Sequence, residues 1–426
     1  MEGRADLADS IRYPEYRWFI LFLGWALFGL MGFNHTIIAA RSEDLIVTLG
    51  ITTQQYYLIY TGSLLAPIVL CLIGGMFGDR YGIRWVVGIG SVVGAVAFLL
   101  RLTADSFTPF FIYMILAGVG FGVVGPNLPK MVAEWFPPSQ VPLATGLYLS
   151  ASGLGMFLGL ALGALWETWQ GAVLTGGVFL AVVVIAWLIF VRDRQRGFTT
   201  DGRQITGVPF KEGFGRAIKS PNIWWAGFSY LIVAGMSTTW IGGIPALMLQ
   251  TKEGFSSFEA AMVPALAVGG FIIGTIFWPI LAQRVGVTKP FYMVLMVMAG
   301  IASLGVYLTA PSVIMWVLAP FPGFFVGGGP AFVMMLPIRL PEFGSRYAAN
   351  AAGVLTSINH IGSFVMLPYM FEPIWRIGGP AWAMAFLLIV LVAGSLLYWP
   401  IPETGRRAME KREKERQEAE AKAPSY

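Results

Sequence analysis

The sequence is poor in charge and almost free of cysteine. Of its 426 residues, 12% are Asp, Glu, Lys or Arg, about half the share in an average soluble domain. It has 1 Cys and 2 His, which excludes a disulfide framework and a cysteine-based metal site. None of the 23 acidic residues falls in the middle of a long apolar run. Since a charge inside a membrane is usually functional, this absence argues against a central carboxylate relay.

Long apolar runs make up most of the chain instead. Hydrophobic residues account for 56% of the sequence, and the mean hydropathy is +0.70. Runs of about 20 residues, as helices, cross a hydrocarbon core of ~30 Å. Because unpaired backbone amides are too costly in lipid, the runs must be helical. We therefore predict an all-α membrane protein with twelve transmembrane helices, at 17–40, 54–77, 84–103, 108–134, 142–165, 171–191, 222–248, 257–282, 289–309, 312–337, 347–370 and 380–400.

Basic residues fall on one side of these helices. If the N-terminus is cytoplasmic, all but four of the 28 Lys and Arg lie on the cytoplasmic side; the four are Arg41, Arg101, Lys252 and Arg376. By the positive-inside rule we expect both termini in the cytoplasm. The charged stretch 1–17 precedes a run of full membrane length, so we expect no cleavable signal. The prediction is a multi-pass protein of the cell (plasma) membrane.

The chain divides into two related halves. The polar, basic loop 192–221 separates six predicted helices, in 1–191, from six more, in 222–402, and a charged tail, 403–426, follows. The first half recurs 204 residues later, pairing Asp79 with Gln283, Arg80 with Arg284, Gly82 with Gly286 and Gly125-Pro126 with Gly329-Pro330. We expect the two prolines to interrupt helices four and ten. Repeats of six helices are typical of carriers with a substrate site at mid-membrane.

The loop between helices two and three carries a recognisable motif. It reads Gly75-x-x-x-Asp79-Arg80-x-Gly82-x-Arg84 and resembles the signature loop of the major facilitator superfamily. The resemblance implies a major facilitator fold and transport by alternating access, with the loop carboxylate facing the start of helix eleven. A carboxylate there is favoured by the positive end of that helix. The gating residues that follow are Gly75, Asp79, Arg80, Gly82, Arg84, Pro126 and Pro330.

Helix four and the loop after it resemble part of the same superfamily more closely. The stretches 118–122, 126–129 and 135–138 are similar to those of nitrate/nitrite and cyanate porters and of oxalate and monocarboxylate carriers. Helices two and eight lack the membrane-embedded arginine pair that the nitrate porters use. The resemblance therefore indicates a small anion or weak organic acid, without naming one.

The two histidines are the deepest groups that can titrate near neutral pH. Each follows an asparagine inside a predicted helix, in opposite halves of the chain. A neutral histidine satisfied by helix–helix hydrogen bonds is the alternative interpretation, and packing is the alternative for the tyrosines of helix two. With the polar residues at equivalent positions, the candidate substrate-binding residues are Asn34, His35, Tyr60, Ser152, Thr238, Thr239, Asn359 and His360.

The predicted function is that of a secondary transporter that moves a small solute across the membrane. Two alternatives stay open: a facilitator or exporter of a neutral or hydrophobic molecule, and a non-transporting receptor or scaffold on the same fold. We expect no enzyme activity, cofactor, metal or nucleic-acid partner, because no cluster of catalytic or ligating residues stands out. The expected partners are the substrate, the lipid bilayer and, as a candidate coupling ion, a proton. The oligomeric state stays open, and a monomer is compatible with the sequence.

Overall fold

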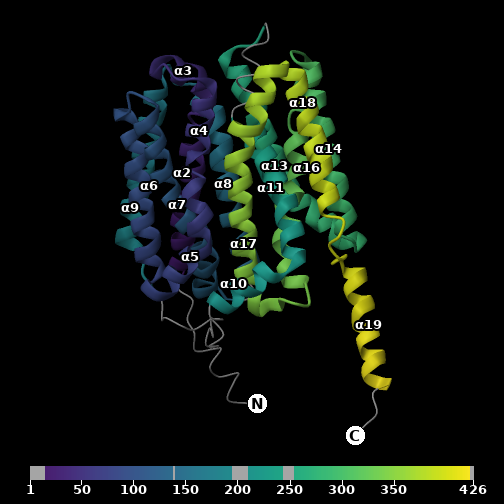
Figure 1. Cartoon of the computed structure of the whole chain (residues 1–426). Helices are drawn as coiled ribbons and strands as arrows, with labels where there is room; N and C mark the ends of the chain where they lie inside the picture. The colour runs from purple at the N-terminus through teal and green to yellow at the C-terminus, as the bar shows by residue number, and fades with distance from the viewer. Residues whose placement is uncertain (1–14, 138–139, 194–209, 243–253, 423–426) are drawn as a thin grey trace.

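The computed structural model describes residues 15–137, 140–193, 210–242 and 254–422. Over these ranges the chain is helical, without a strand. The long helices run side by side in one bundle, with α3 at one end and α10 at the other (Figure 1); we call these the α3 end and the α10 end. The helices are α2 (Tyr16–Thr36), η2 (Ala39–Arg41), α3 (Ser42–Leu49), α4 (Thr53–Gly62), α5 (Leu65–Tyr81), α6 (Ile83–Leu100), η3 (Arg101–Thr103), α7 (Phe107–Trp135), α8 (Val141–Gly163), α9 (Trp169–Phe190), α10 (Phe210–Lys219), α11 (Pro221–Ile241), α13 (Ser257–Val285), α14 (Lys289–Thr309), α15 (Val313–Leu318), α16 (Phe321–Arg339), α17 (Gly344–Val365), η4 (Met366–Phe371), α18 (Glu372–Leu397) and α19 (Arg406–Lys422).

The surface of the bundle is apolar, as a lipid-facing surface should be. Ten stretches of the described chain are long and apolar enough to cross a membrane. On α9 the residues Val178, Val182, Ile185 and Ile189 are each about half exposed or more. They recur at steps of three and four, so they form one outward stripe. Water would not stabilise such a stripe, and lipid does.

Glycines let neighbouring helices touch backbone to backbone. Between α2 and α8, Gly155 lies directly against the backbone of Gly29. Between α13 and α16, Gly270 meets the Pro320 carbonyl and Gly323 meets the Ala267 carbonyl. A Cβ at any of these three glycines would collide with main-chain atoms that cannot move aside alone. Small residues at helix contacts are the usual solution inside membranes.

The predicted span 54–77 corresponds to one apolar stretch, Thr53–Gly78, and this stretch consists of two helices, α4 and α5. The break lies at Ser63 and Leu64. Pro67, in the first turn of α5, has no N–H to continue the α4 hydrogen-bond ladder to the Ser63 carbonyl. Ser63, which lies at the break between α4 and α5, is fully buried.

The end of the chain also differs from the expected pattern. The predicted loop between helices eleven and twelve is helical: a π-helical turn, η4, follows α17 and leads into α18 at Glu372. Gly379, with φ of 78°, bends α18 just before Pro380, where the predicted helix 380–400 begins. The predicted helix 312–337 is divided into α15 and α16, and the last part of 222–248 lies outside the described residues. Inside the predicted loop 192–221, α10 is a helix.

The expected interruptions at Pro126 and Pro330 are wrong. Both prolines lie inside continuous helices, α7 and α16. A proline removes one backbone hydrogen bond and permits a bend without ending a helix held by its neighbours. Gly74 of α5 packs against the Gly122 carbonyl, the group that Pro126 leaves without its helical donor.

Candidate substrate site and gates

His35 is buried in the N-terminal part of the bundle, at the end of α2. Its Nδ1 is 2.9 Å from the Ser63 hydroxyl, at the break between α4 and α5. The ring packs against the rings of Tyr60 and Phe121, with centroid distances of 4.5 and 6.0 Å. His35 is 5% exposed. The broken helix therefore supplies both the hydroxyl and the ring that hold this histidine.

Tyr60 joins His35 to the end of α11. Its ring fills the space beside Gly242, where a Cβ would not fit. Thr238 and Thr239 precede Gly242 by four and three residues and so lie on the same side of the helix. The Tyr60 hydroxyl and the Thr239 hydroxyl are both buried without a hydrogen-bond partner. An unsatisfied buried hydroxyl in a folded protein needs an explanation, and a place for a ligand is one.

Asn34 turns away from His35, toward α9. Its amide donates to the carbonyls of Leu30 and Gly176, each at 2.9 Å. Ser152 is half-buried on α8, where its carbonyl lies close to Gly32 of α2. The structure therefore groups His35 and Tyr60 with Thr238 and Thr239, and it leaves Asn34 and Ser152 outside that group.

His360 lies on α17, with Asn359 half-buried beside it. The His360 Nδ1 is 2.8 Å from the Thr356 carbonyl of its own helix. Gly353, two turns earlier on the same side of α17, packs against Cys71 and Leu72 of α5. This places His360 on the side of α17 that meets α5.

Arg101 is a functional candidate that the sequence did not single out. It is fully buried and donates to the carbonyls of Phe98 and Asn34, at 3.0 and 3.1 Å. Both carbonyls belong to the last turns of helices, α6 and α2, whose ends carry partial negative charge. That field stabilises the guanidinium where the described residues give it no carboxylate. The available signal was its position as one of four basic residues on the unexpected side.

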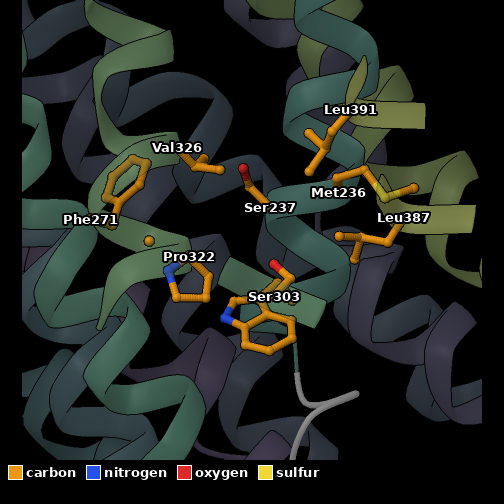
Figure 2. Close-up of a pocket in the computed structure, with 10 residues that line it drawn as sticks. Met236, Ser237, Phe271, Ser303, Pro322, Val326, Leu387 and Leu391 are labelled. Carbon is orange, nitrogen blue, oxygen red and sulfur yellow. The ribbon is translucent and has the colours of Figure 1, made fainter. Parts of the chain in front are cut away.

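A small cavity lies among the later helices, between α11, α13, α14, α16 and α18. Figure 2 shows Ser237 and Ser303 in a lining that is otherwise apolar, with Phe271 and Leu387 among the walls. The cavity is small, about 20 Å³, which is room for a water molecule.

The signature loop is held to the end of α9. Gly82 has φ of 90° and lies so close to the Asp193 carboxylate that a side chain would not fit. The Arg84 amide donates to Asp193 at 2.9 Å, and its guanidinium donates to the Leu188 carbonyl. Gly75 lies beside Pro126, and the Arg80 guanidinium lies over the Tyr81 ring. The Asp79 side chain is outside the described part, so its predicted partner is not observed.

The second copy of the loop repeats this arrangement. Gly286 has φ of 89°, and the Thr288 amide donates to Glu403 at 2.9 Å. Thr288 follows Arg84 by the same 204 residues that separate Gly286 from Gly82. Partial burial raises the pKa of Glu403. Hydrogen bonds from Thr288, Gly405 and Lys289 lower the pKa by more than burial raises it, so it lies below the ordinary 4.5. Asp193 and Glu403 were missed because each lies beyond the repeated motif.

Across the described ranges, no three His, Cys, Asp or Glu side chains come together as a metal site requires. The polar groups that do converge, near Tyr60, are hydroxyl and imidazole groups, which bind solutes by hydrogen bonds.

Comparison with known proteins gives a consistent family. The 3-(3-hydroxy-phenyl)propionate transporter of Escherichia coli (strain K12) is 26% identical over 72% of this chain and 74% of its own length. The hexuronate transporter of the same strain is 24% identical over 64% and 67%. The probable anion transporter 4, chloroplastic, of Arabidopsis thaliana is 23% identical over 72% of this chain, which spans 56% of that relative's length.

Solved structures show the same fold. A bacterial homolog of the human lysosomal transporter Spinster, in an inward-facing and unoccupied conformation, superposes with a TM-score of 0.69 at 17% identity. The match covers 91% of this chain and 95% of that one. The family model described as Major Facilitator Superfamily matches residues 18–367. This stretch includes the signature loop and the site around Tyr60, and the chain therefore belongs to the Major Facilitator Superfamily.

Proposed function

We propose that the protein is a secondary transporter of a small organic anion and works by alternating access. The observation that carries the proposal is the Tyr60 hydroxyl, which is buried without a partner on the ring that packs against His35. The unpaired, buried Thr239 hydroxyl lies on the end of α11 that the Tyr60 ring contacts through Gly242. Hydroxyl groups donate well to carboxylate oxygens, and such charge-assisted bonds are stronger than neutral ones. The names of the relatives, which include anion, hexuronate and hydroxyphenylpropionate transporters, support an acid as substrate.

The proposed architecture has twelve transmembrane helices in two halves, 1–191 and 222–402. Two observations support it. The stretch Asn350–Leu397 counts as one of the ten apolar stretches but contains both α17 and α18, and α11 is a 21-residue helix outside those ten. The turns at Gly82 and Gly286 repeat with matching φ and matching carboxylate contacts. The site around Tyr60 then lies where the halves meet.

The α10 end is proposed to be cytoplasmic. It carries the signature loop and the basic helices α10 and α19 (Figure 1), in keeping with the excess of positive charge on the inner side of membrane proteins. With this orientation both termini lie in the cytoplasm, and the α3 end faces outward. The signature loop, with Asp79, and the prolines Pro126 and Pro330 are then proposed to gate the inner side.

The histidines are proposed as titratable contacts for the substrate. His35 lies beside Tyr60, and His360 lies on the side of α17 that meets α5. An imidazole that gains a proton attracts an anion, so binding of the two is linked. This linkage makes the proton a candidate coupling ion. Asn359 and Ser152 remain proposed contacts for the polar part of the substrate.

The test is uptake into proteoliposomes that contain the purified full chain. Labelled glucuronate and 3-hydroxyphenylpropionate serve as probes, with glucose as the uncharged comparison. Saturable uptake of an acid is expected for the wild type. Tyr60→Phe removes one hydroxyl and should weaken the apparent affinity by about tenfold, as expected when a hydrogen bond to a charged group is lost.

Tyr113→Phe is the matched control, since Tyr113 is half-buried on α7 and outside the proposed site; its affinity should stay unchanged. Uptake of glucose in preference to both acids would instead indicate a carrier for neutral molecules. Binding without flux would indicate a receptor on this fold. Either result overturns the proposed function.

A further inference from the structure

Glu372 is an acidic residue that the fold removes from water. It begins α18 at the α3 end and is 5% exposed. Among the acidic residues whose burial the structure describes, Glu372 is the one that is buried. The sequence hid this position, because the residue falls in the predicted loop between helices eleven and twelve. Burial of a carboxyl group inside a transporter calls for a functional explanation.

The two oxygens of Glu372 have different surroundings. Oε1 is 3.7 Å from the Arg376 Nε, on the next turn of the same helix. The Arg376 side chain is 71% exposed, so water screens this pair and it contributes little. Oε2 is buried and has no hydrogen-bond partner. The carboxyl group thus has one oxygen toward a solvated cation and one toward the protein interior.

The interior neighbour of Glu372 comes from α4, in the other predicted half. The Tyr57 hydroxyl is buried, lacks a partner, and lies within electrostatic range of the Glu372 carboxyl group. One turn earlier on α4, the Gln54 amide donates to the Pro368 carbonyl of η4 at 3.5 Å. These contacts close the α3 end between α4 and η4, with Glu372 behind them.

The other groups that face this contact carry no compensating positive charge. Besides Tyr57, α4 presents Tyr56, which is fully buried and interacts with the Ser42 side chain. On η4 the titratable residue is Tyr369, which is half exposed. The last turn of α11, residues 237–241, has no charged side chain. Arg376 is therefore the described cation at this contact, and it lies in solvent.

We propose that Glu372 is a proton-binding site in the gate at the α3 end. When α4 and η4 separate, the carboxylate meets external water and takes up one proton. This protonation gives a neutral carboxylic acid and involves no oxidation or reduction. When they close, the acid is buried, because a neutral group loses less than a charged one on leaving water. The described residues supply no hydrogen-bond donor to Oε2 in the closed form, which favours the neutral acid over the carboxylate. This proposal rests on the proposed transport function and names a proton as a second ligand.

The experiment measures gate closure directly, in the full chain in liposomes. Gln54→Cys in a Cys71→Ser background places one thiol at the contact between α4 and η4. Its reaction with a membrane-impermeant maleimide, quenched after a fixed time and corrected for thiolate fraction, reports how often the gate is open. Labelling should slow as the external pH is lowered, by up to about tenfold per pH unit for one linked proton. Glu372→Gln, which resembles the protonated acid, should label slowly at every pH.

Glu259→Gln is the matched control, since Glu259 is a solvated carboxylate that caps α13 at the same end; it should keep the wild-type pH profile. A wild-type profile in a folded Glu372→Gln protein, with an unchanged thermal transition, would overturn the proton site. The readout needs no substrate, so failure of this proposal is separate from failure of anion uptake. A pH-independent wild-type gate would also overturn it.

Discussion

At the α10 end, one carboxylate stabilises each of the two related turns: Asp193 at the first and Glu403 at the second. Glu403 accepts from the backbone amides of Thr288, Lys289 and Gly405, and from the Thr288 hydroxyl. The amides of Thr288 and Lys289 begin α14, where no helical carbonyl is available to them. A negative charge there is also favoured by the helix dipole. The chain beyond the last long helix is thereby tied to the turn that repeats the signature loop.

Replacement of Glu403 by Gln should lower the stability of the protein at neutral pH by roughly 0.5–1 kcal/mol, the usual scale for a charge at a helix N-terminus. Because the pKa of Glu403 is lowered in the folded state, its contribution is complete above 4.5 and is lost as pH falls below that value. Thermal unfolding in detergent at neutral and acidic pH measures this.

The difference between wild type and Glu403→Gln should shrink on acidification. Glu410→Gln is the control, because the Glu410 ion pair with Arg406 is largely exposed and contributes little. A Glu403→Gln variant that unfolds like the wild type at neutral pH would contradict the assignment.

At the residue scale, the sequence located some groups and missed others for physical reasons. His35 and Tyr60 were predicted as site residues because polar residues in apolar runs are conspicuous, and their role in binding stays a prediction. Arg101 and Glu372 were missed because their burial depends on which helix ends meet them. That information resides in tertiary contacts, such as the Asn34 carbonyl at Arg101, and no local pattern contains it.

Among the helices, those with internal prolines are the proposed moving elements. Pro126 frees the Gly122 carbonyl of α7, and α5 approaches that point closely through Gly74. Pro330 lies at the equivalent place in α16. A missing hydrogen bond lowers the cost of bending at these points.

Alanine at Pro126 or Pro330 should restore that hydrogen bond and favour the straighter form of the helix. We expect the ratio of outward to inward access to change about fivefold, a coupling of about 1 kcal/mol. Labelling of single cysteines at the two ends of the bundle gives the ratio. Pro290→Ala, in the first turn of α14, should be silent because proline is readily replaced there. Equal ratios in all four proteins would count against bending at these prolines.

Helix positions followed well from hydropathy, while breaks did not. The long runs of α7 and α9 coincide with predicted helices because length and apolarity alone decide them. The break at Ser63 and the π-helical turn η4 depend on what packs nearby. The effect of proline was mispredicted in two opposite ways. The helix is broken near Pro67, where no break was expected, and α7 is continuous at Pro126, where a break was expected.

Across the whole molecule, α5 and α17 bring the two proposed halves together. A Cβ on Gly353 would lie 3.7 Å from the Cys71 carbonyl and 3.9 Å from the Leu72 Cα. The natural Cys71 is the sole cysteine of the chain. Gly353→Cys therefore places a second cysteine on the helix face that packs against the backbone of the first.

Mild oxidation of Gly353→Cys should link α5 to α17 and stop uptake, because alternating access requires the halves to part. Uptake should return with a reductant. Gly353→Cys in a Cys71→Ser background should be indifferent to both treatments. Full uptake by protein shown to be cross-linked would contradict a rocking motion at this contact.

The glycine contact between α2 and α8 has a mechanical consequence. With Gly155 against the Gly29 backbone, the two helices are in direct main-chain contact. Sliding one past the other by a single residue would drive side chains into main chain. We therefore expect the two helices to move together as one rigid body when the proposed halves rock. A displacement at one side of the membrane then reaches the other through the helix pair itself, across ~30 Å.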